Sequence, residues 1–267
     1  MNNSSLRLDH LTVAGTTIPL VHGGHGQPLL FLNGGDAFHK SEPWLNLLAG
    51  SYRLYAPRHP GYGGAPPADH IRSVNELSLF YLELLEQCDL TDAILVGASF
   101  GAWVALETAV RSCARISSIV LIDALGVKFG GPTDAEIADI YTLPPDKVRS
   151  LQYADAKKCE PDYAAMDEAT VRVVIEDRTG EALYGWRPYM HNPVLHKWLW
   201  RIRRPTLVLW GAQDGIVSAD YGRRIAKEIP GAEFELIRDC GHYPHVENPQ
   251  AVMDHLVPFA SRGGAQG

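Results

Sequence analysis

The sequence predicts an α/β fold in which a mostly parallel central sheet is flanked by helices and interrupted by a helical cap. Short apolar runs typical of strands alternate with amphipathic stretches typical of helices, first up to about residue 125 and again after residue 203. The segment between them is more polar, and its apolar positions have helical spacing. Because alternating strands and helices favour right-handed crossovers and parallel pairing, we expect residues 1–125 and 204–267 to form the core and residues 126–203 to be inserted as a cap.

The elements of the core follow in order along the chain. Strands at 6–13 and 17–21, joined by a turn at Ala14-Gly15, predict an antiparallel lead-in. The first half continues with strands at 29–32 and 53–56, a helix at 74–87, a strand at 93–96, a helix at 100–112 and a strand at 118–122. The second half contains a strand at 206–210, a helix at 219–229, a strand at 233–237 and a helix at 250–261. The stretch "VHGGHG" at 21–26 precedes a core strand, and we expect it to form a hairpin turn.

Composition excludes several classes of function. With 267 residues, 46% of them hydrophobic, the chain can build one large core. A net charge of −7 argues against a nucleic-acid or anionic membrane surface. The first ten residues have neither a basic nor an apolar region, so we expect no secretory signal, and no apolar run approaches the roughly 18 residues of a membrane span. We therefore expect a cytoplasmic protein. Whether it forms a homodimer is left open.

Cysteine usage predicts neither a disulfide framework nor a zinc site. The four cysteines are widely separated and form no CxxC pair: Cys88, Cys113, Cys159 and Cys240. We expect no metal and no cofactor.

The segment "AILVGASFGAW" at 93–103 carries the first chemical signal. Its Gly-x-Ser-x-Gly motif lies where an apolar strand meets a helix, and a serine on such a tight turn has its hydroxyl lifted clear of the sheet. Gly97 and Gly101 allow the strand and the helix to pack closely around Ser99. The alternative is a glycine-rich turn whose serine only caps the helix.

A nucleophilic serine needs a base and a group that orients the base. Asp214 follows the strand "TLVLW", and His242 follows the strand "EFELI". Each of the three residues stands at the carboxyl end of a core strand, so they can meet on one rim of the sheet. Asp123 is a rival acid and His245 a rival base. The pair of histidines also has HxxH spacing, but no third metal ligand stands beside it.

Together these segments resemble the α/β-hydrolase-fold serine hydrolases with a helical cap, over nearly the whole chain. The resemblance rests on "GASFG", "LVLWGAQDGIV", "DCGHYPHVENP" and the Gly-rich turn "APRHPGYGGA" at 56–65. It implies Ser99 as nucleophile, His242 as general base and then acid, and Asp214 as orienting carboxylate. It also implies an oxyanion hole made by two backbone N–H groups, one from Phe100 and one from the loop after the third strand.

The loop "LNGGD" after the strand at 29–32 is placed to supply the second donor. We expect Gly35 to be this donor and Gly34 to permit the turn. Similar proteins usually have His-Gly at this point, whereas this chain has Asn33 and Gly34, so Asn33 must support the loop differently. Asn33 and Gly34 are expected beside the substrate. A phosphate site is disfavoured because no Lys-Ser/Thr follows the glycines.

Specificity is expected to come mainly from the cap segment "YGWRPYMHNPVLHKWLW" at 184–200. Candidate substrate-binding residues are Trp186, Arg187, Tyr189 and Trp198, together with Tyr243 beside the base. Aromatic residues of a small helical cap more often belong to its internal packing than to its pocket.

The function expected is cofactor-free hydrolysis of a small carboxylic ester, thioester or lactone through an acyl-enzyme. An alternative is hydrolysis of a carbon–carbon bond in a vinylogous diketone, as in the related meta-cleavage-product hydrolases. Those enzymes usually carry Asn at the position of Ala98 and Trp at the position of Tyr243. A non-catalytic, ligand-sensing member of the fold is the alternative from a different class.

Overall fold

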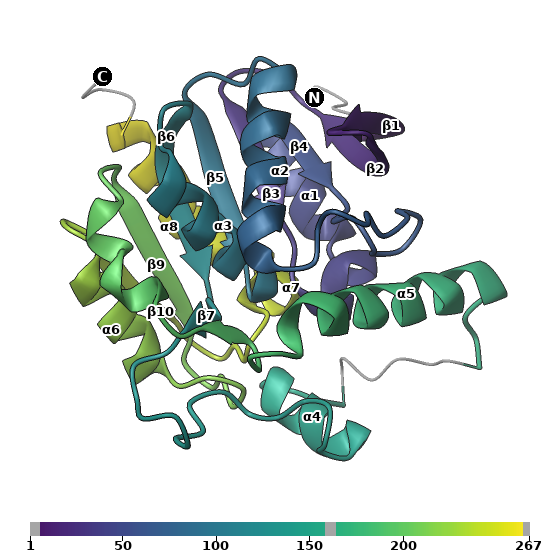
Figure 1. Ribbon diagram of the computed structural model, residues 1–267, viewed down its shortest axis with the longest axis vertical. Helices are drawn as coiled ribbons and strands as arrows, with labels where there is room; N and C mark the ends of the chain where they lie inside the picture. Colours follow the sequence, from purple (N-terminus) through teal and green to yellow (C-terminus); the bar gives the residue numbers. More distant parts are fainter. Residues whose placement is uncertain (1–5, 158–163, 264–267) are drawn as a thin grey trace.

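An eight-stranded sheet forms the centre of the protein (Figure 1). The computed structural model describes residues 6–157 and 164–263. The sheet has the strand order β1-β2-β4-β3-β5-β6-β9-β10. The bounds of these strands are Arg7–Val13 (β1), Thr16–Gly23 (β2), Pro28–Leu32 (β3), Arg53–Pro57 (β4), Ala93–Ala98 (β5), Ile116–Ile122 (β6), Thr206–Gly211 (β9) and Glu233–Ile237 (β10).

The pairing of the strands confirms the predicted fold class. β1 and β2 pair antiparallel, as do β2 and β4, and every other neighbouring pair in the sheet is parallel. The predicted core strands and helices all lie within two residues of the observed bounds. The expected hairpin at residues 21–26 is wrong, because β4 lies between β2 and β3 in the sheet. β3 needs two parallel partners to satisfy its buried backbone, and β4 and β5 supply them.

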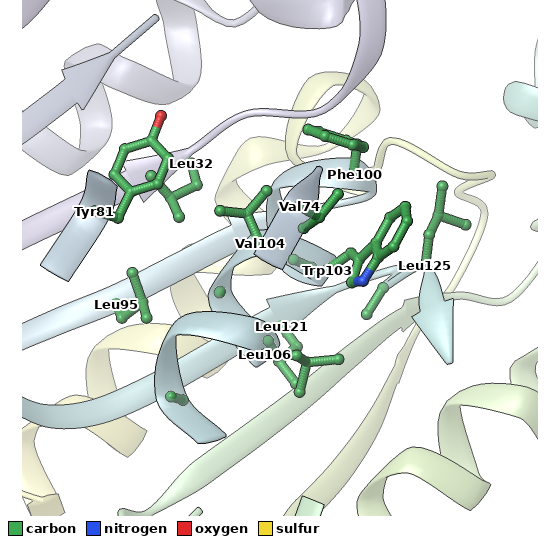
Figure 2. Packing of buried hydrophobic residues seen from close by; sticks show 14 of the residues in the cluster. Leu32, Val74, Tyr81, Leu95, Phe100, Trp103, Val104, Leu106, Leu121 and Leu125 are labelled. Atoms are coloured by element: carbon green, nitrogen blue, oxygen red, sulfur yellow. The ribbon is translucent and has the colours of Figure 1, made fainter. Parts of the chain in front are cut away.

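Helices cover both faces of the sheet. Their bounds are Glu42–Ser51 (α1), Val74–Gln87 (α2), Phe100–Arg111 (α3), Ala219–Glu228 (α6), Pro244–Glu247 (α7) and Pro249–Gly263 (α8). Successive side chains of β3 alternate between the faces, so Leu30 packs with α2 and α3 and Phe31 packs with α1 and α8. Figure 2 shows residues of the first of these layers, among them Leu32 and Leu95 from the sheet and Trp103 and Val104 from α3.

The segment between β6 and β9 contains the elements expected to form the cap. They are β7 (Gly126–Val127), α4 (Pro145–Gln152), α5 (Glu168–Gly185), β8 (His191–Asn192) and the short 3-10 helices η2 (Leu195–Lys197) and η3 (Leu199–Arg201). In Figure 1, both α4 and α5 are seen below the sheet. β7 and β8 pair in parallel. Residues 158–163, including Cys159, lie outside the described residues, and Cys88, Cys113 and Cys240 are free thiols.

A buried ion pair attaches α5 to the turn that follows β4. Arg58 Nη1 lies 2.7 Å from Asp177 Oδ2, and the Asp177 side chain is fully buried. The backbone N–H of Gly63 donates to the same carboxylate at 2.9 Å. Removing one partner of a buried, hydrogen-bonded pair costs far more than breaking a surface pair, so these contacts fix the position of α5 relative to the core.

The length and the polarity of the helices decide whether any of them could cross a membrane. α5 spans 18 residues and carries buried acidic side chains at Asp177 and Glu181. In the parts of the chain that the structure describes, no helix combines the length and the apolar character needed to cross a bilayer.

Candidate active site

Ser99 occupies a strained turn between β5 and α3. Its φ of 52° and ψ of −118° are values that side-chain-bearing residues rarely adopt. The turn is possible because its neighbours lack side chains: a Cβ on Gly97 would lie 2.5 Å from the carbonyl oxygen of Gly101, and a Cβ on Gly101 would lie 2.0 Å from that of Leu32. The two glycines therefore permit the close packing that the sequence predicts.

Three side chains that are far apart in the sequence form one chain of hydrogen bonds. His242 Nε2 lies 2.7 Å from Ser99 Oγ, and His242 Nδ1 lies 2.8 Å from Asp214 Oδ2. The carboxylate oxygen can only accept, so Nδ1 carries the proton and Nε2 is left to accept the serine proton. Asp214 Oδ1 accepts from the backbone N–H groups of Ile216 and Val217, which fixes the carboxylate. An arrangement of this kind allows a histidine to take the proton of a serine hydroxyl.

The rival acid, Asp123, lies directly behind Asp214. The side-chain atoms of Asp123, Asp214 and His242 lie within 4.8 Å of one another, but it is Asp214 that accepts the hydrogen bond of His242 Nδ1. Asp123 accepts from the backbone N–H of Gly211 at 2.9 Å and is fully buried. Burial first, and then the charge of Asp214, holds the pKa of Asp123 well above its usual range. A carboxyl in this environment favours its neutral form.

The rival base, His245, does not face Ser99. It is buried in the apolar layer on the other face, where its ring makes edge contacts with Phe31 and Trp44 at centroid distances of 5.9 and 6.1 Å. Burial, followed by the neighbouring His242, lowers the pKa of His245 to about 3. His245 is thus held neutral as part of the core.

The end of α4 is joined to the loops that carry the acid and the base. The carbonyl of Leu151 accepts from Gly215 N–H at 2.9 Å, and the carbonyl of Gln152 accepts from His242 N–H at 2.7 Å. These carbonyls belong to the last turn of α4, where no further helical N–H is available to them. The segment between β6 and β9 therefore contributes directly to the position of His242.

The loop after β3 approaches Ser99 closely. A Cβ on Gly34 would lie 2.6 Å from Ser99 Cβ, so only glycine fits there. Gly34 has extended backbone angles, whereas Gly35 has a φ of +49°. From the sequence we expect Gly34 to permit the turn; the positive φ lies at Gly35 instead, and Gly34 permits the close approach to Ser99.

Gly35 and Phe100 begin two helices on either side of this contact. Gly35 is the first residue of the 3-10 helix η1 (Gly35–Lys40), and Phe100 is the first residue of α3. Amides at such positions have no acceptor inside their own helix. Among the bonds recorded between described residues, neither amide has an acceptor, so both are available as donors.

Asn33 supports this loop through its backbone. Its side chain is buried, and its Nδ2 and Oδ1 atoms have no partner in the described part of the chain. The carbonyl of Asn33 instead accepts from Nε2 of His59 at 2.8 Å, and the hydroxyl of Tyr81 donates to the other ring nitrogen. The His59 ring also lies 5.5 Å from the Phe100 ring. His59, which the sequence analysis did not single out, touches both segments that carry the candidate donors.

A small cavity lies beside Ser99 and His242. Its volume is ≈ 10 Å³, which is about the space that one water molecule needs. The residues that line it are Ser99, Leu125, Ile137, Ile140, Gln152, Glu181, Tyr189, Met190, Ile216, His242 and Tyr243. A substrate larger than water fits only after some of these side chains have moved.

The structure brings two of the expected substrate-binding side chains to this cavity and leaves others outside it. Tyr243 and Tyr189 line it, and the Tyr243 ring packs against His242 at a centroid distance of 4.9 Å. Trp186 is 62% exposed and Arg187 is exposed as well. Trp198 borders a separate surface groove with Glu107. Asn33 and Gly34 do not line the cavity. In the sequence, an aromatic residue on an exposed turn looks the same as one that lines a pocket. This is why some of the expected substrate-binding residues lie outside the cavity.

Among the described residues, one group has the composition of a metal site, namely Asp123, Asp214 and His242. The nitrogen of His242 that faces the carboxylates carries a proton for Asp214. Asp123 favours its neutral form. The donor set is therefore used for hydrogen bonding and fits a metal ion poorly.

The buried neutral histidine at position 245 predicts a loss of stability in acid. An unfolded histidine takes up its proton near pH 6.5, whereas His245 resists it down to about pH 3. The free energy of unfolding should therefore fall as the pH drops below 6.5, and His245 alone accounts for roughly 2–3 kcal/mol at pH 4.5. In urea titrations at pH 8 and pH 4.5, His245→Phe should reduce the acid-induced loss by that amount. An equal loss in both proteins would contradict the prediction.

Comparisons with known proteins identify the family of the chain. Residues 20–255 match the model of the alpha/beta hydrolase family. The chain is 24% identical to the uncharacterized hydrolase YugF of Bacillus subtilis, over 91% of this chain and 89% of that protein. It is 25% identical to a 2-hydroxy-6-oxononadienedioate/2-hydroxy-6-oxononatrienedioate hydrolase of Cupriavidus pinatubonensis, over 80% and 78%. The structure superimposes on the enol-lactonase of Burkholderia xenovorans with a TM-score of 0.75 at 20% identity, covering 95% and 100% of the two chains. A sheet of this order, a serine on a strained strand-to-helix turn and a family match over most of the chain lead to one conclusion: this protein belongs to the alpha/beta hydrolase family.

Proposed function

We propose that this protein is a cofactor-free serine hydrolase that cleaves a small carboxylic ester, thioester or lactone through an acyl-enzyme. The observation that carries the proposal is the continuous hydrogen-bond chain from Ser99 Oγ through both nitrogens of His242 to Asp214. A hydroxyl is a weak nucleophile at neutral pH unless such a base is in place.

In the proposed reaction, Ser99 Oγ attacks the carbonyl carbon while His242 Nε2 takes its proton. The N–H groups of Gly35 and Phe100 stabilise the oxyanion, aided by the positive end of the α3 dipole. His242 then gives the proton to the leaving alcohol, thiol or enol oxygen. Water, deprotonated by the same nitrogen, hydrolyses the acyl-enzyme and restores Ser99. Asp214 keeps the proton on Nδ1 throughout and stabilises the charged ring.

Residues 126–203 act in this proposal as a cap over the site. Tyr189 and Met190 from this segment line the cavity beside Ser99, together with Glu181 of α5. Because the cavity holds about one water molecule in this state, substrate enters when cap side chains move, and closure then excludes bulk water.

A second candidate is hydrolysis of a carbon–carbon bond, and the match to the Cupriavidus hydrolase favours it. The same triad would serve that chemistry. Ala98 and Tyr243, which stand where such enzymes usually carry Asn and Trp, argue for the ester reaction.

Labelling with a fluorophosphonate, followed by a substrate screen, tests the proposal. We expect the probe to modify Ser99, as located by mass spectrometry of the digested protein, and to abolish turnover. The screen then compares short p-nitrophenyl esters, a lactone and a 2-hydroxy-6-oxo-dienoate. Turnover of the dienoate without any ester or lactone would favour the carbon–carbon reaction. A protein that binds ligand but is neither labelled nor active would be a sensor.

A further inference from the structure

His59 anchors the loop that carries one of the two candidate oxyanion donors. The residue is fully buried, and its Nε2 lies 2.8 Å from the carbonyl oxygen of Asn33. A carbonyl can only accept, so Nε2 carries the ring proton and Nδ1 accepts from the hydroxyl of Tyr81. Burial lowers the pKa of His59 to about 4, so the ring is neutral at neutral pH and stays a donor to the loop and an acceptor for Tyr81.

The loop at residues 33–35 needs an anchor outside itself. Glycine has no Cβ, so the peptide groups around Gly34 and Gly35 rotate more freely than those of other residues. A rotation there would turn the Gly35 N–H away, and a donor stabilises an oxyanion only while it points at it. The amide of Asn33 has no partner among the described residues. In the described part of the chain, the bond from His59 is the one side-chain hydrogen bond that reaches this loop.

The same ring contacts the segment that carries the second candidate donor. The rings of His59 and Phe100 lie 5.5 Å apart between centroids, at an interplanar angle of 84°. The ring of Tyr62 lies 4.9 Å from His59 and also packs edge-on. Such edge contacts prefer particular directions. A change at position 59 would therefore reach one donor through a hydrogen bond and the other through packing.

The turn that carries His59 is held on both sides by α5. The hydroxyl of Tyr184 donates to the carbonyl of Pro60 at 2.8 Å. On the other side, Arg58 forms the buried ion pair with Asp177. Because the residues directly before and after His59 are both bonded to α5, the backbone of His59 has little freedom to move.

We infer that His59 is a positioning residue for the oxyanion hole: its Nε2–H holds the carbonyl of Asn33 so that the Gly35 N–H points at the reacting carbonyl, and its ring keeps the start of α3 at Phe100 in place. The inference rests on the proposed serine-hydrolase function. The oxyanion forms in the transition states of acylation and deacylation and not in the bound ester, so His59 should affect kcat more than KM.

His59→Phe tests the inference, because it keeps a buried aromatic ring and removes the donor. Since loss of one whole oxyanion donor costs about 100- to 1000-fold, a misaligned donor should lower kcat for p-nitrophenyl butyrate by about 10- to 100-fold. KM should stay within about 3-fold of wild type. Butylboronic acid forms a tetrahedral adduct with a nucleophilic serine, and its inhibition constant should rise by at least about 10-fold.

His59→Gln separates positioning from packing. Its amide N–H can reach the place of Nε2, so kcat should return to within about 5-fold of wild type. A role in packing alone predicts the opposite order, because phenylalanine fills the place of a buried ring better than glutamine does.

Two further variants complete the experiment. Thr108→Val is the matched control: it removes a buried donor that lies 2.8 Å from the carbonyl of Val104, later in α3, and kcat should stay within about 2-fold of wild type. Tyr81→Phe removes the hydroxyl bonded to Nδ1 and keeps the ring. It leaves His59 with one anchor, so kcat should fall by about 3- to 10-fold at unchanged KM.

A wild-type kcat in folded His59→Phe, as judged by circular dichroism, would overturn the inference, and so would a rise in KM alone or a His59→Gln variant less active than His59→Phe. If His59→Phe does not fold, a wild-type kcat in Tyr81→Phe would overturn it. When fluorophosphonate labels Ser99 of the wild-type protein and the ester is hydrolysed, these outcomes refute the positioning role alone. Without labelling and without turnover, the proposed function fails and the inference fails with it.

Discussion

Ser99→Ala should lower kcat/KM for a short p-nitrophenyl ester by about 10⁴- to 10⁶-fold, the usual scale for loss of a triad nucleophile. The hydroxyl is the atom that would form the acyl-enzyme, and the structure offers His242 one hydroxyl at 2.7 Å. The fold should remain, because the variant keeps the Cβ and loses one buried hydroxyl. Equilibrium unfolding in urea should therefore change by about 1 kcal/mol or less.

A second buried serine provides the control for this experiment. Ser78 of α2 is fully buried and bonds the carbonyl of Asn75 at 2.6 Å. Ser78→Ala removes the same group from a place away from the cavity, so turnover should stay within about 2-fold of wild type. If Ser99→Ala retained wild-type turnover, the acyl-enzyme mechanism would be wrong.

Asp214→Asn should lower kcat/KM by about 10⁴-fold, the scale known for this change in a serine-protease triad. The amide of asparagine can donate to Nδ1 of His242, which favours the tautomer whose Nε2 carries the proton. That nitrogen can then no longer accept the proton of Ser99. The measurement is the pH dependence of kcat/KM for the ester, together with circular dichroism to show that the fold persists.

Asp123→Asn provides the contrast that separates the two acids. The amide oxygen can still accept from Gly211 N–H, and the side chain is neutral, as buried Asp123 favours. Activity should stay within about 3-fold of wild type.

The raised pKa of Asp123 also predicts a pH dependence of stability. Asp123 contributes stability below its unfolded pKa near 3.9, and this contribution is lost as the pH rises. Asp123→Asn should therefore be more stable relative to wild type at pH 8 than at pH 4. If it inactivated the enzyme as strongly as Asp214→Asn, Asp123 would be the functional acid.

The sequence predicts the core of this fold well because its signals are local and regular. A short apolar run that leads into a glycine, such as Ala93 to Val96 before Gly97, is typical of a buried strand in a chain whose strands alternate with helices. The approach of Ser99, Asp214 and His242 follows from the same regularity, since parallel strands bring their carboxyl ends to one rim. α1 was not predicted, although Pro43 in its first turn is a typical start signal.

Other parts of the site depend on long-range contacts that the neighbouring sequence does not reveal. His59 bonds a carbonyl 26 positions away in the sequence, and nothing around it distinguishes a ring that supports a loop from a surface histidine. Glu181 lies on a helix whose polar and apolar residues are mixed around its axis, so its burial follows from tertiary packing alone. Trp186 and Trp198 show the opposite case: they were predicted to bind substrate because large aromatic residues often line pockets, but both are exposed.

The bonds from the last turn of α4 to the acid and base loops have a consequence for protein engineering. The carbonyls of Leu151 and Gln152 are adjacent and hold Gly215 and His242 respectively, so a recombinant enzyme with a cap transplanted from another hydrolase would lose both supports unless the donor cap carried two acceptors with the same spacing. Libraries that aim to alter specificity should therefore keep residues 145–152 and randomise the far side of α5. In this protein the end of α4 helps to hold the backbone at Gly215 and His242, so the segment between β6 and β9 cannot be exchanged without replacing those two bonds.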